Sequence, residues 1–156
     1  MDQITRRQIG LMLGGSAAVS ARGQTQKHGT TIHQEVDFKA PAARIYEILL
    51  DAKQFSACTK DTAEIQPQAG GAFKLFGGRI EGRNIELLPN QRIVQAWRPA
   101  YWPAGVYSIV KFELVPREAG TRVVLDHAAF TEDQWEGLSS GWQEHYWGPL
   151  HKYLNA

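Results

Sequence analysis

Residues 135–154, WEGLSSGWQEHYWGPLHKYL, are the stretch of sequence that decides the fold. At the helical period, a stripe about 80° wide gathers most of the large apolar side chains of this stretch: Trp135, Leu138, Trp142, Tyr146, Pro149 and Tyr153. So wide an apolar face needs a covering surface, because exposed apolar area is unfavourable in water. We expect Pro149 to kink the helix, with the stripe resuming in register beyond it. The stretch therefore predicts one long C-terminal helix that packs on a receiving sheet.

The segment before this helix carries the signals of such a sheet. Turn-forming dipeptides divide residues 61–130 at hairpin-like intervals: Gly70-Gly71, Gly77-Gly78, Pro89-Asn90 and Ala119-Gly120. The pieces between them are short and rich in β-branched and aromatic residues, which is typical of an antiparallel meander. In the last piece Val123, Leu125 and His127 share one face of the predicted strand.

The segment before the meander predicts one more strand and two short helices. Residues 30–38 alternate enough to form the first strand. Pro41 then suits the first turn of a helix, AARIYEILL, and Asp51 suits the cap of a second helix that runs through Phe55. Residues 30–156 therefore read as a single α+β domain whose antiparallel sheet has about six to seven strands.

The first residues of the chain predict an export signal rather than part of the domain. Arg6 and Arg7 directly precede a short, weakly apolar run that ends in small residues. This order resembles a bacterial twin-arginine signal, so we expect residues 1–21 to be a signal peptide and residues 22–29 a polar linker. The predicted location is the periplasm or the cell exterior, and a cytoplasmic protein is the alternative. Because the run is too short for a permanent anchor, we expect no stable membrane insertion after cleavage.

The order of the predicted elements resembles the helix-grip fold of the START-like, SRPBCC superfamily. Short motifs narrow the resemblance to the branch named after the activator of heat-shock protein 90 ATPase homologue: Ala40-Pro41 through Tyr46, Gly70-Gly71-Ala72-Phe73, Gly82 through Val94 followed by Trp97, Gly120-Thr121-Arg122-Val123, and Gly141-Trp142. The match covers about residues 31–155. The resemblance implies a sheet wrapped around the C-terminal helix, with a hydrophobic ligand enclosed between the two. The branch name also implies a possible protein partner.

Aromatic side chains are the candidates for the lining of that enclosed space. Aromatic walls with a few polar points are typical of pockets for small apolar molecules, and the predicted ligand-binding residues are Phe55, Trp97, Trp102, Tyr107, His127, Trp142 and Tyr146. The alternative is that these residues fill the core. Trp102 lies in a loop-like segment, RPAYWPAG, where an aromatic residue often covers a pocket mouth.

Two histidines are candidates for the polar residues of this lining. His127 is either the polar point inside the space or a core histidine satisfied by one hydrogen bond. His145 approaches from the predicted helix, and a pair formed by the two histidines could share a proton of the ligand.

Composition argues against several other classes of function. Cys58 is the single cysteine, which excludes an internal disulfide and a multi-cysteine metal cluster. Without residues 1–21 the chain holds fifteen basic and fifteen acidic residues, since two of the 17 basic and one of the 16 acidic residues lie in that segment. This balance argues against nucleic acid as a partner. His145 and His151 are too far apart around a helix to chelate one metal, and we expect no metal or other cofactor.

The function predicted from these observations is the binding of a small hydrophobic or aromatic molecule in a hollow between the sheet and the C-terminal helix. No catalytic residue is predicted, because nucleophile and phosphate-binding motifs are missing from the sequence. One alternative is a co-chaperone-like protein-interaction module, although export would separate it from a cytosolic chaperone. Another is a hydrolase or cyclase that uses ionisable groups in the hollow. Direct contact between Trp97 and Trp142, with no void large enough for a small organic molecule, would argue against the binding function.

Overall fold

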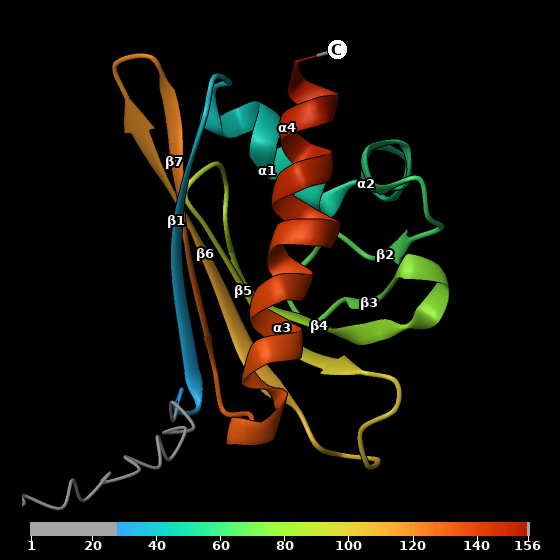
Figure 1. Ribbon diagram of the computed structural model, residues 1–156. Helices are drawn as coiled ribbons and strands as arrows, with labels where there is room; N and C mark the ends of the chain where they lie inside the picture. The colour runs from blue at the N-terminus through green and yellow to red at the C-terminus, as the bar shows by residue number, and fades with distance from the viewer. Residues whose placement is uncertain (1–27, 156) are drawn as a thin grey trace, which may run out of the picture.

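The computed structural model describes residues 28–155, so the predicted signal peptide and most of the predicted linker lie outside the described residues. In this range a seven-stranded antiparallel sheet curves around a long C-terminal helix, and two short helices follow the first strand (Figure 1). The predicted α+β helix-grip class is confirmed.

The sheet is an antiparallel meander whose last strand pairs with the first strand of the chain. In chain order the strands are β1 (Thr31–Phe38), β2 (Glu64–Ile65), β3 (Ala72–Leu75), β4 (Ile80–Leu88), β5 (Arg92–Pro99), β6 (Ser108–Arg117) and β7 (Gly120–Ala128). Their order across the sheet is β1-β7-β6-β5-β4-β3-β2. Neighbours along the chain therefore pair from β2 to β7, and the pairing of β1 with β7 is the one long-range closure.

The two helices after β1 begin where the sequence predicts. α1 (Ala42–Leu50) starts directly after Pro41. α2 (Ala52–Thr59) is one turn longer than predicted, and Asp51 caps it by accepting a hydrogen bond from the backbone N–H of Gln54 at 2.8 Å. Both helices lie at the end of the sheet where the C-terminal helix finishes (Figure 1).

The C-terminal helix contains a π-helical turn that its sequence pattern did not indicate. It runs through α3 (Trp135–Trp142), the π-turn η3 (Gln143–Trp147) and α4 (Gly148–Leu154). Within the π-turn the backbone N–H of Gly148 donates to the carbonyl of Gln143, five residues back. Pro149 follows at once and has no N–H with which to resume the regular ladder.

The π-turn moves the buried face of the helix by one residue. Up to Tyr146 the predicted stripe is buried or partly buried, but beyond it the chain buries Trp147 and Leu150 and leaves Pro149 partly exposed. The prediction that the stripe resumes in register beyond Pro149 is wrong, because a π-turn takes one extra residue per turn. This shift packs Trp147 and Leu150 into the core.

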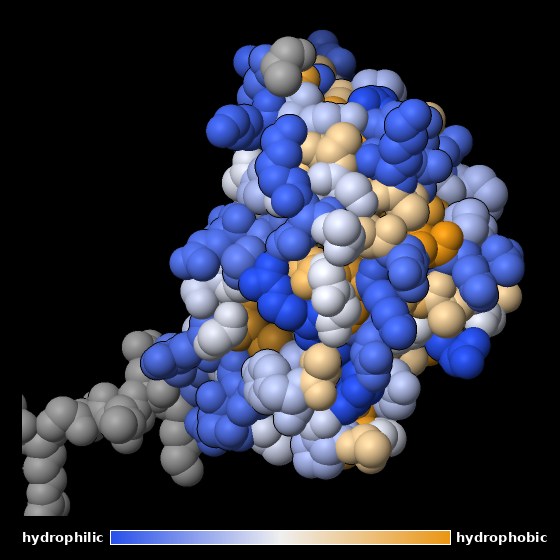
Figure 2. Space-filling view, turned by 90° about the vertical axis from the view of Figure 1, so that its right-hand side faces the viewer, coloured by the Kyte–Doolittle hydropathy of each residue, from blue (hydrophilic) through white to orange (hydrophobic). Residues whose placement is uncertain are grey.

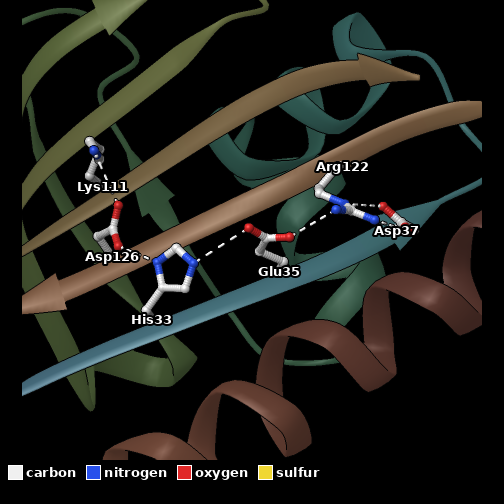
Figure 3. A network of polar contacts seen from close by, with 6 residues as sticks. All are labelled: His33, Glu35, Asp37, Lys111, Arg122 and Asp126. Atoms are coloured by element: carbon white, nitrogen blue, oxygen red, sulfur yellow. Dashed lines mark hydrogen bonds and ion pairs between the residues drawn. The ribbon is translucent and has the colours of Figure 1, made fainter.

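The outer face of the sheet is polar and carries ion pairs that cross the strands (Figure 3). The carboxylate of Asp126 lies 2.6 Å from a ring nitrogen of His33 and 3.1 Å from the ammonium group of Lys111. The guanidinium of Arg122 pairs with the carboxylates of Glu35 and Asp37. These side chains are exposed or partly exposed to solvent, so each pair contributes little to stability. The polar outer face leaves the inner face of the sheet as the one that packs against the helices.

Candidate functional site

A groove of about 420 Å³ lies between the sheet and the C-terminal helix. The sheet, the short 3₁₀ turn η1 (Phe76–Gly78) and the loop after β5 form one wall, with Phe76, Arg79, Ile80, Trp97, Pro99, Ala100 and Tyr101. The helix forms the other wall, with Gly137, Leu138, Gly141, Trp142, His145 and Tyr146. The side of the molecule that carries β2, β3 and η1 shows apolar patches among hydrophilic side chains (Figure 2).

Two glycines of the helix leave room for this groove. Gly137 and Gly141 are four residues apart and therefore lie on the same face of α3. A Cβ atom at Gly137 would meet no atom within 4 Å, and one at Gly141 would meet only the Cδ2 atom of His145 at 3.9 Å. Larger side chains at these positions would occupy the groove.

Trp97, Trp142 and Tyr146 form the inner aromatic wall. The rings of Trp97 and Trp142 stack with centroids 5.6 Å apart and planes inclined by 27°. Tyr146 lies against Trp142 with ring centroids 4.4 Å apart. The two indoles are therefore in direct contact and fill the space under this part of the helix. The hollow is a lateral groove beside their contact, not a void beneath the helix.

Phe76 packs against this aromatic wall and has an unusual backbone conformation. Its φ of 54° is left-handed, which typically costs a non-glycine residue about 1–2 kcal/mol. Its ring packs against Phe55, Tyr146 and His145 at centroid distances of 5.5, 5.6 and 5.7 Å. These contacts hold the strained residue in place.

His127 lies behind Trp142 and does not line the groove. The indole N–H of Trp142 donates to Nδ1 of His127 at 3.1 Å, so Nδ1 carries no proton. The proton of the neutral ring is therefore on Nε2, which lies 2.8 Å from Oγ of Ser108 and donates to it. Ser108 donates in turn to the backbone carbonyl of Trp97 at 2.8 Å.

This network leaves the His127–Ser108 pair unsuited to nucleophilic catalysis. Burial lowers the pKa of His127 to about 3, so the ring is neutral near physiological pH. Its one acceptor nitrogen already binds Trp142, and the serine proton already binds a backbone carbonyl. A base with no free lone pair cannot take a proton from the serine. His127 is a core histidine satisfied by hydrogen bonds.

Three of the seven predicted ligand-binding residues line the groove: Trp97, Trp142 and Tyr146. Phe55 packs behind Phe76, as His127 does behind Trp142. The indole of Trp102 is buried and donates to Gln134 at 3.2 Å. Tyr107 lies on the surface, with the Arg98 guanidinium 5.9 Å from its ring centroid.

Sequence reasoning missed the residues that shape the groove rather than line it with aromatic rings. The spacing of Gly137 and Gly141 was the available signal, because two glycines one turn apart in a helix often mark a close approach or an open space. The left-handed conformation of Phe76 gave no signal, since such conformations are rare for bulky residues.

The polar side chains of the groove lie at its rim. Arg79 pairs with Asp61 at 2.5 Å and also donates to the backbone carbonyl of Phe76. His145 is about half exposed and lies next to Glu144. Within residues 28–155 no cluster of three histidine, cysteine or acidic side chains could hold a metal ion, and no helix is long and apolar enough to cross a membrane.

Residues 39–155 match the family model described as Activator of Hsp90 ATPase homolog 1-like protein. Among curated proteins, the activator of 90 kDa heat shock protein ATPase homolog 2 of Mus musculus is 27% identical over 115 residues, which cover 74% of this chain and 35% of that protein. An uncharacterized protein of Schizosaccharomyces pombe is 28% identical over 138 residues, with 87% and 40% covered. The chain thus spans well under half the length of these curated relatives.

Solved structures resemble this chain in fold. An HSP90 activator from Plasmodium falciparum superposes with a TM-score of 0.76 at 23% identity, covering 81% of this chain and 97% of that one. CalU16 from Micromonospora echinospora superposes with a TM-score of 0.66 at 21% identity, covering 80% and 74%. At these identities the likeness establishes the shared fold alone.

Proposed function

The chain belongs to the Activator of Hsp90 ATPase homolog 1-like protein family, and we propose that it binds a small apolar or aromatic molecule in its groove. The observation that carries the proposal is the groove itself, with its wall of Trp97, Trp142 and Tyr146. Its volume of about 420 Å³ falls within the range of roughly 300–1,000 Å³ that is typical of small-molecule sites. Stacked aromatic side chains provide flat apolar area for a planar ligand.

A groove-filling variant tests this proposal. Gly141→Leu places a branched side chain in the groove, and it also favours the helix, because leucine has the higher helix propensity. Ser140→Leu is the matched control, since Ser140 is exposed on the same helix and does not line the groove. The assay follows the fluorescence of an apolar naphthalene probe and the quenching of tryptophan emission.

We expect Gly141→Leu to weaken probe binding at least about tenfold, which corresponds to a loss of about 1.4 kcal/mol. Ser140→Leu should bind the probe as the parent protein does. Equal binding by both variants would place the probe elsewhere and remove the support for the groove.

A protein partner is the second candidate function. The family description and the curated relatives name the ATPase of the 90 kDa heat shock protein, although the chain spans only part of those relatives. The test adds the purified protein to this ATPase and measures ATP turnover and complex formation. Unchanged turnover together with no complex by sedimentation would rule this candidate out.

We also propose export through a twin-arginine-type signal, on the basis of Arg6 and Arg7 and the apolar run that follows them. Fractionation of a bacterium that produces the full chain would test this. The Arg6→Lys, Arg7→Lys double variant keeps both charges but should leave the protein in the cytoplasm. Identical distribution of the two proteins would contradict export by this route.

A further inference from the structure

Trp97 is the one tryptophan of the chain whose indole N–H has no hydrogen-bond acceptor within residues 28–155. The other four indoles each donate to an acceptor, as seen for Trp102, Trp135, Trp142 and Trp147. Trp97 is only 4% exposed. An unpaired buried N–H typically costs about 1–3 kcal/mol, and the polar group that lies beside this one is the hydroxyl of Tyr146.

The hydroxyl of Tyr146 adds a second donor next to this N–H. Both residues line the groove. Burial raises the pKa of the Tyr146 hydroxyl, and the neighbouring Trp97 N–H, the smaller influence, lowers it. The hydroxyl therefore keeps its proton near physiological pH and can donate it. A neutral hydroxyl donor, with the indole N–H beside its oxygen, thus lies in an otherwise apolar part of the wall.

The charge around these donors favours a neutral ligand group over an anion. Among the described residues, the groove wall holds two side chains that can carry positive charge, Arg79 and His145. Arg79 is already paired with Asp61, and His145 lies at the exposed rim beside Glu144. A carboxylate at Trp97 would lose its hydration without gaining a cation as a partner. A pure hydrocarbon would leave the hydroxyl proton of Tyr146 unpaired.

Resting on the ligand-binding function already proposed, we infer that the groove selects apolar molecules that carry a neutral carbonyl group, such as an aryl ketone, ester or lactone. The carbonyl oxygen accepts a hydrogen bond from the Tyr146 hydroxyl, whose own oxygen faces the Trp97 indole N–H. The apolar body of the ligand lies along Trp142 and Leu138 toward the glycine face of α3.

Three probes of nearly the same shape test this inference on the full chain. 2-Acetylnaphthalene carries a ketone, 2-isopropenylnaphthalene replaces its oxygen with a methylene group, and 2-naphthoate carries an anion. Equilibrium dialysis gives the three affinities, and infrared spectroscopy gives the carbonyl stretch of the bound ketone. The test variant is Tyr146→Phe. Tyr107→Phe is the matched control, because it removes the same hydroxyl from a tyrosine that lies on the surface and does not line the groove.

We expect the ketone to bind about tenfold tighter than its methylene analogue, the ratio that one net hydrogen bond supplies. This preference should disappear in Tyr146→Phe and persist in Tyr107→Phe. The carbonyl stretch of the bound ketone should lie at a lower frequency in the parent protein than in Tyr146→Phe, because a hydrogen bond weakens the C=O bond.

Each other outcome has a distinct meaning. Equal affinity for the ketone and its methylene analogue in the parent protein would overturn the inference and leave the ligand-binding function standing. Tightest binding of 2-naphthoate would overturn it in favour of an anion site. Failure of all three probes to bind would overturn the ligand-binding function together with the inference. The parent protein alone decides among these outcomes, so the test survives if Tyr146→Phe does not fold.

Discussion

We predict that acidification from about pH 7.5 to about pH 5 destabilises the protein through His127. The ring of His127 is fully buried, and Trp142 and Ser108 hold it in its neutral form. Burial lowers its pKa to about 3 in the folded protein, against 6.5 for an ordinary histidine. Between these two values the unfolded chain binds a proton that the folded chain does not. The free energy of unfolding must therefore fall as the pH falls through this window.

The size of the effect follows from the distance between the pH and the unfolded pKa. A pH of about 5 lies about 1.5 pH units below the pKa of the unfolded histidine. Proton binding therefore stabilises the unfolded chain by about 2 kcal/mol at this pH. For a small domain whose stability is about 5–15 kcal/mol, this loss is large enough to measure. Well above the unfolded pKa of 6.5 the contribution of His127 to the pH slope vanishes, because the histidine is then unprotonated in both states.

Other titrating groups require a variant that isolates His127. The hydrogen bond to Asp126 raises the pKa of His33, so its contribution has the opposite sign: it is present at acid pH and lost as the pH rises. The pKa of Asp37 is lowered by its hydrogen bond to Arg122, so that carboxylate adds a loss of stability at still lower pH. Both groups lie on the outer face of the sheet and remain in a variant of His127.

His127→Gln is the appropriate variant, because its amide can still accept from Trp142 and donate to Ser108 but does not titrate near neutral pH. Urea unfolding followed by tryptophan fluorescence gives the free energy of unfolding at each pH. We expect the parent protein to lose about 2 kcal/mol more than His127→Gln between about pH 7.5 and pH 5. His33→Gln, the surface control, should retain the loss due to His127. The same pH slope in the parent protein and in His127→Gln would refute the buried neutral histidine.

Three further predictions concern stability and use the same unfolding assay. Gly120→Ala places a Cβ 2.0 Å from the backbone oxygen of Phe38 at a φ of 144°, so we expect a loss of at least about 3 kcal/mol. Gly105→Ala, at a φ of 80° in open space, should lose only about 1 kcal/mol, and similar losses for the two would contradict the steric argument. Asp51→Ala removes the cap of α2 and should destabilise the protein by about 1 kcal/mol, whereas Asp51→Ser should keep most of that stability because serine can also cap the helix. Ser108→Ala leaves the buried imidazole N–H without its acceptor, which predicts a loss of about 1–3 kcal/mol, whereas no loss would argue for the other tautomer.

The fold could be predicted because its elements follow local and periodic rules. Pro41 and Asp51 mark the starts of α1 and α2, and the glycine-containing turns mark the hairpins of the meander. The inward face of β7, with Val123, Leu125 and His127, followed directly from strand alternation. Each of these signals depends on neighbours within a few residues in the sequence.

The site was harder to predict because its shape depends on contacts between distant residues. Aromatic composition identified Trp97, Trp142 and Tyr146 as groove residues but could not separate them from Phe55 and Trp102, which are equally aromatic and pack elsewhere. Whether an aromatic side chain lines a hollow or fills the core depends on what faces it, and a single sequence does not state that.

Four departures from regular structure border the groove, and their proximity to one another argues for a role of the groove. The left-handed Phe76, the two helix glycines of α3, the π-turn that carries Tyr146 and the unpaired N–H of Trp97 each lower stability on their own. All of them border one hollow, whereas other irregularities, such as the bulge between β4 and β5 at Asn84 and Glu86, lie elsewhere in the fold. A fold selected for stability alone would fill Gly137 and Gly141 and give Trp97 an acceptor. Energetic disadvantages that accumulate beside one hollow are what a binding site retained for its ligand would produce.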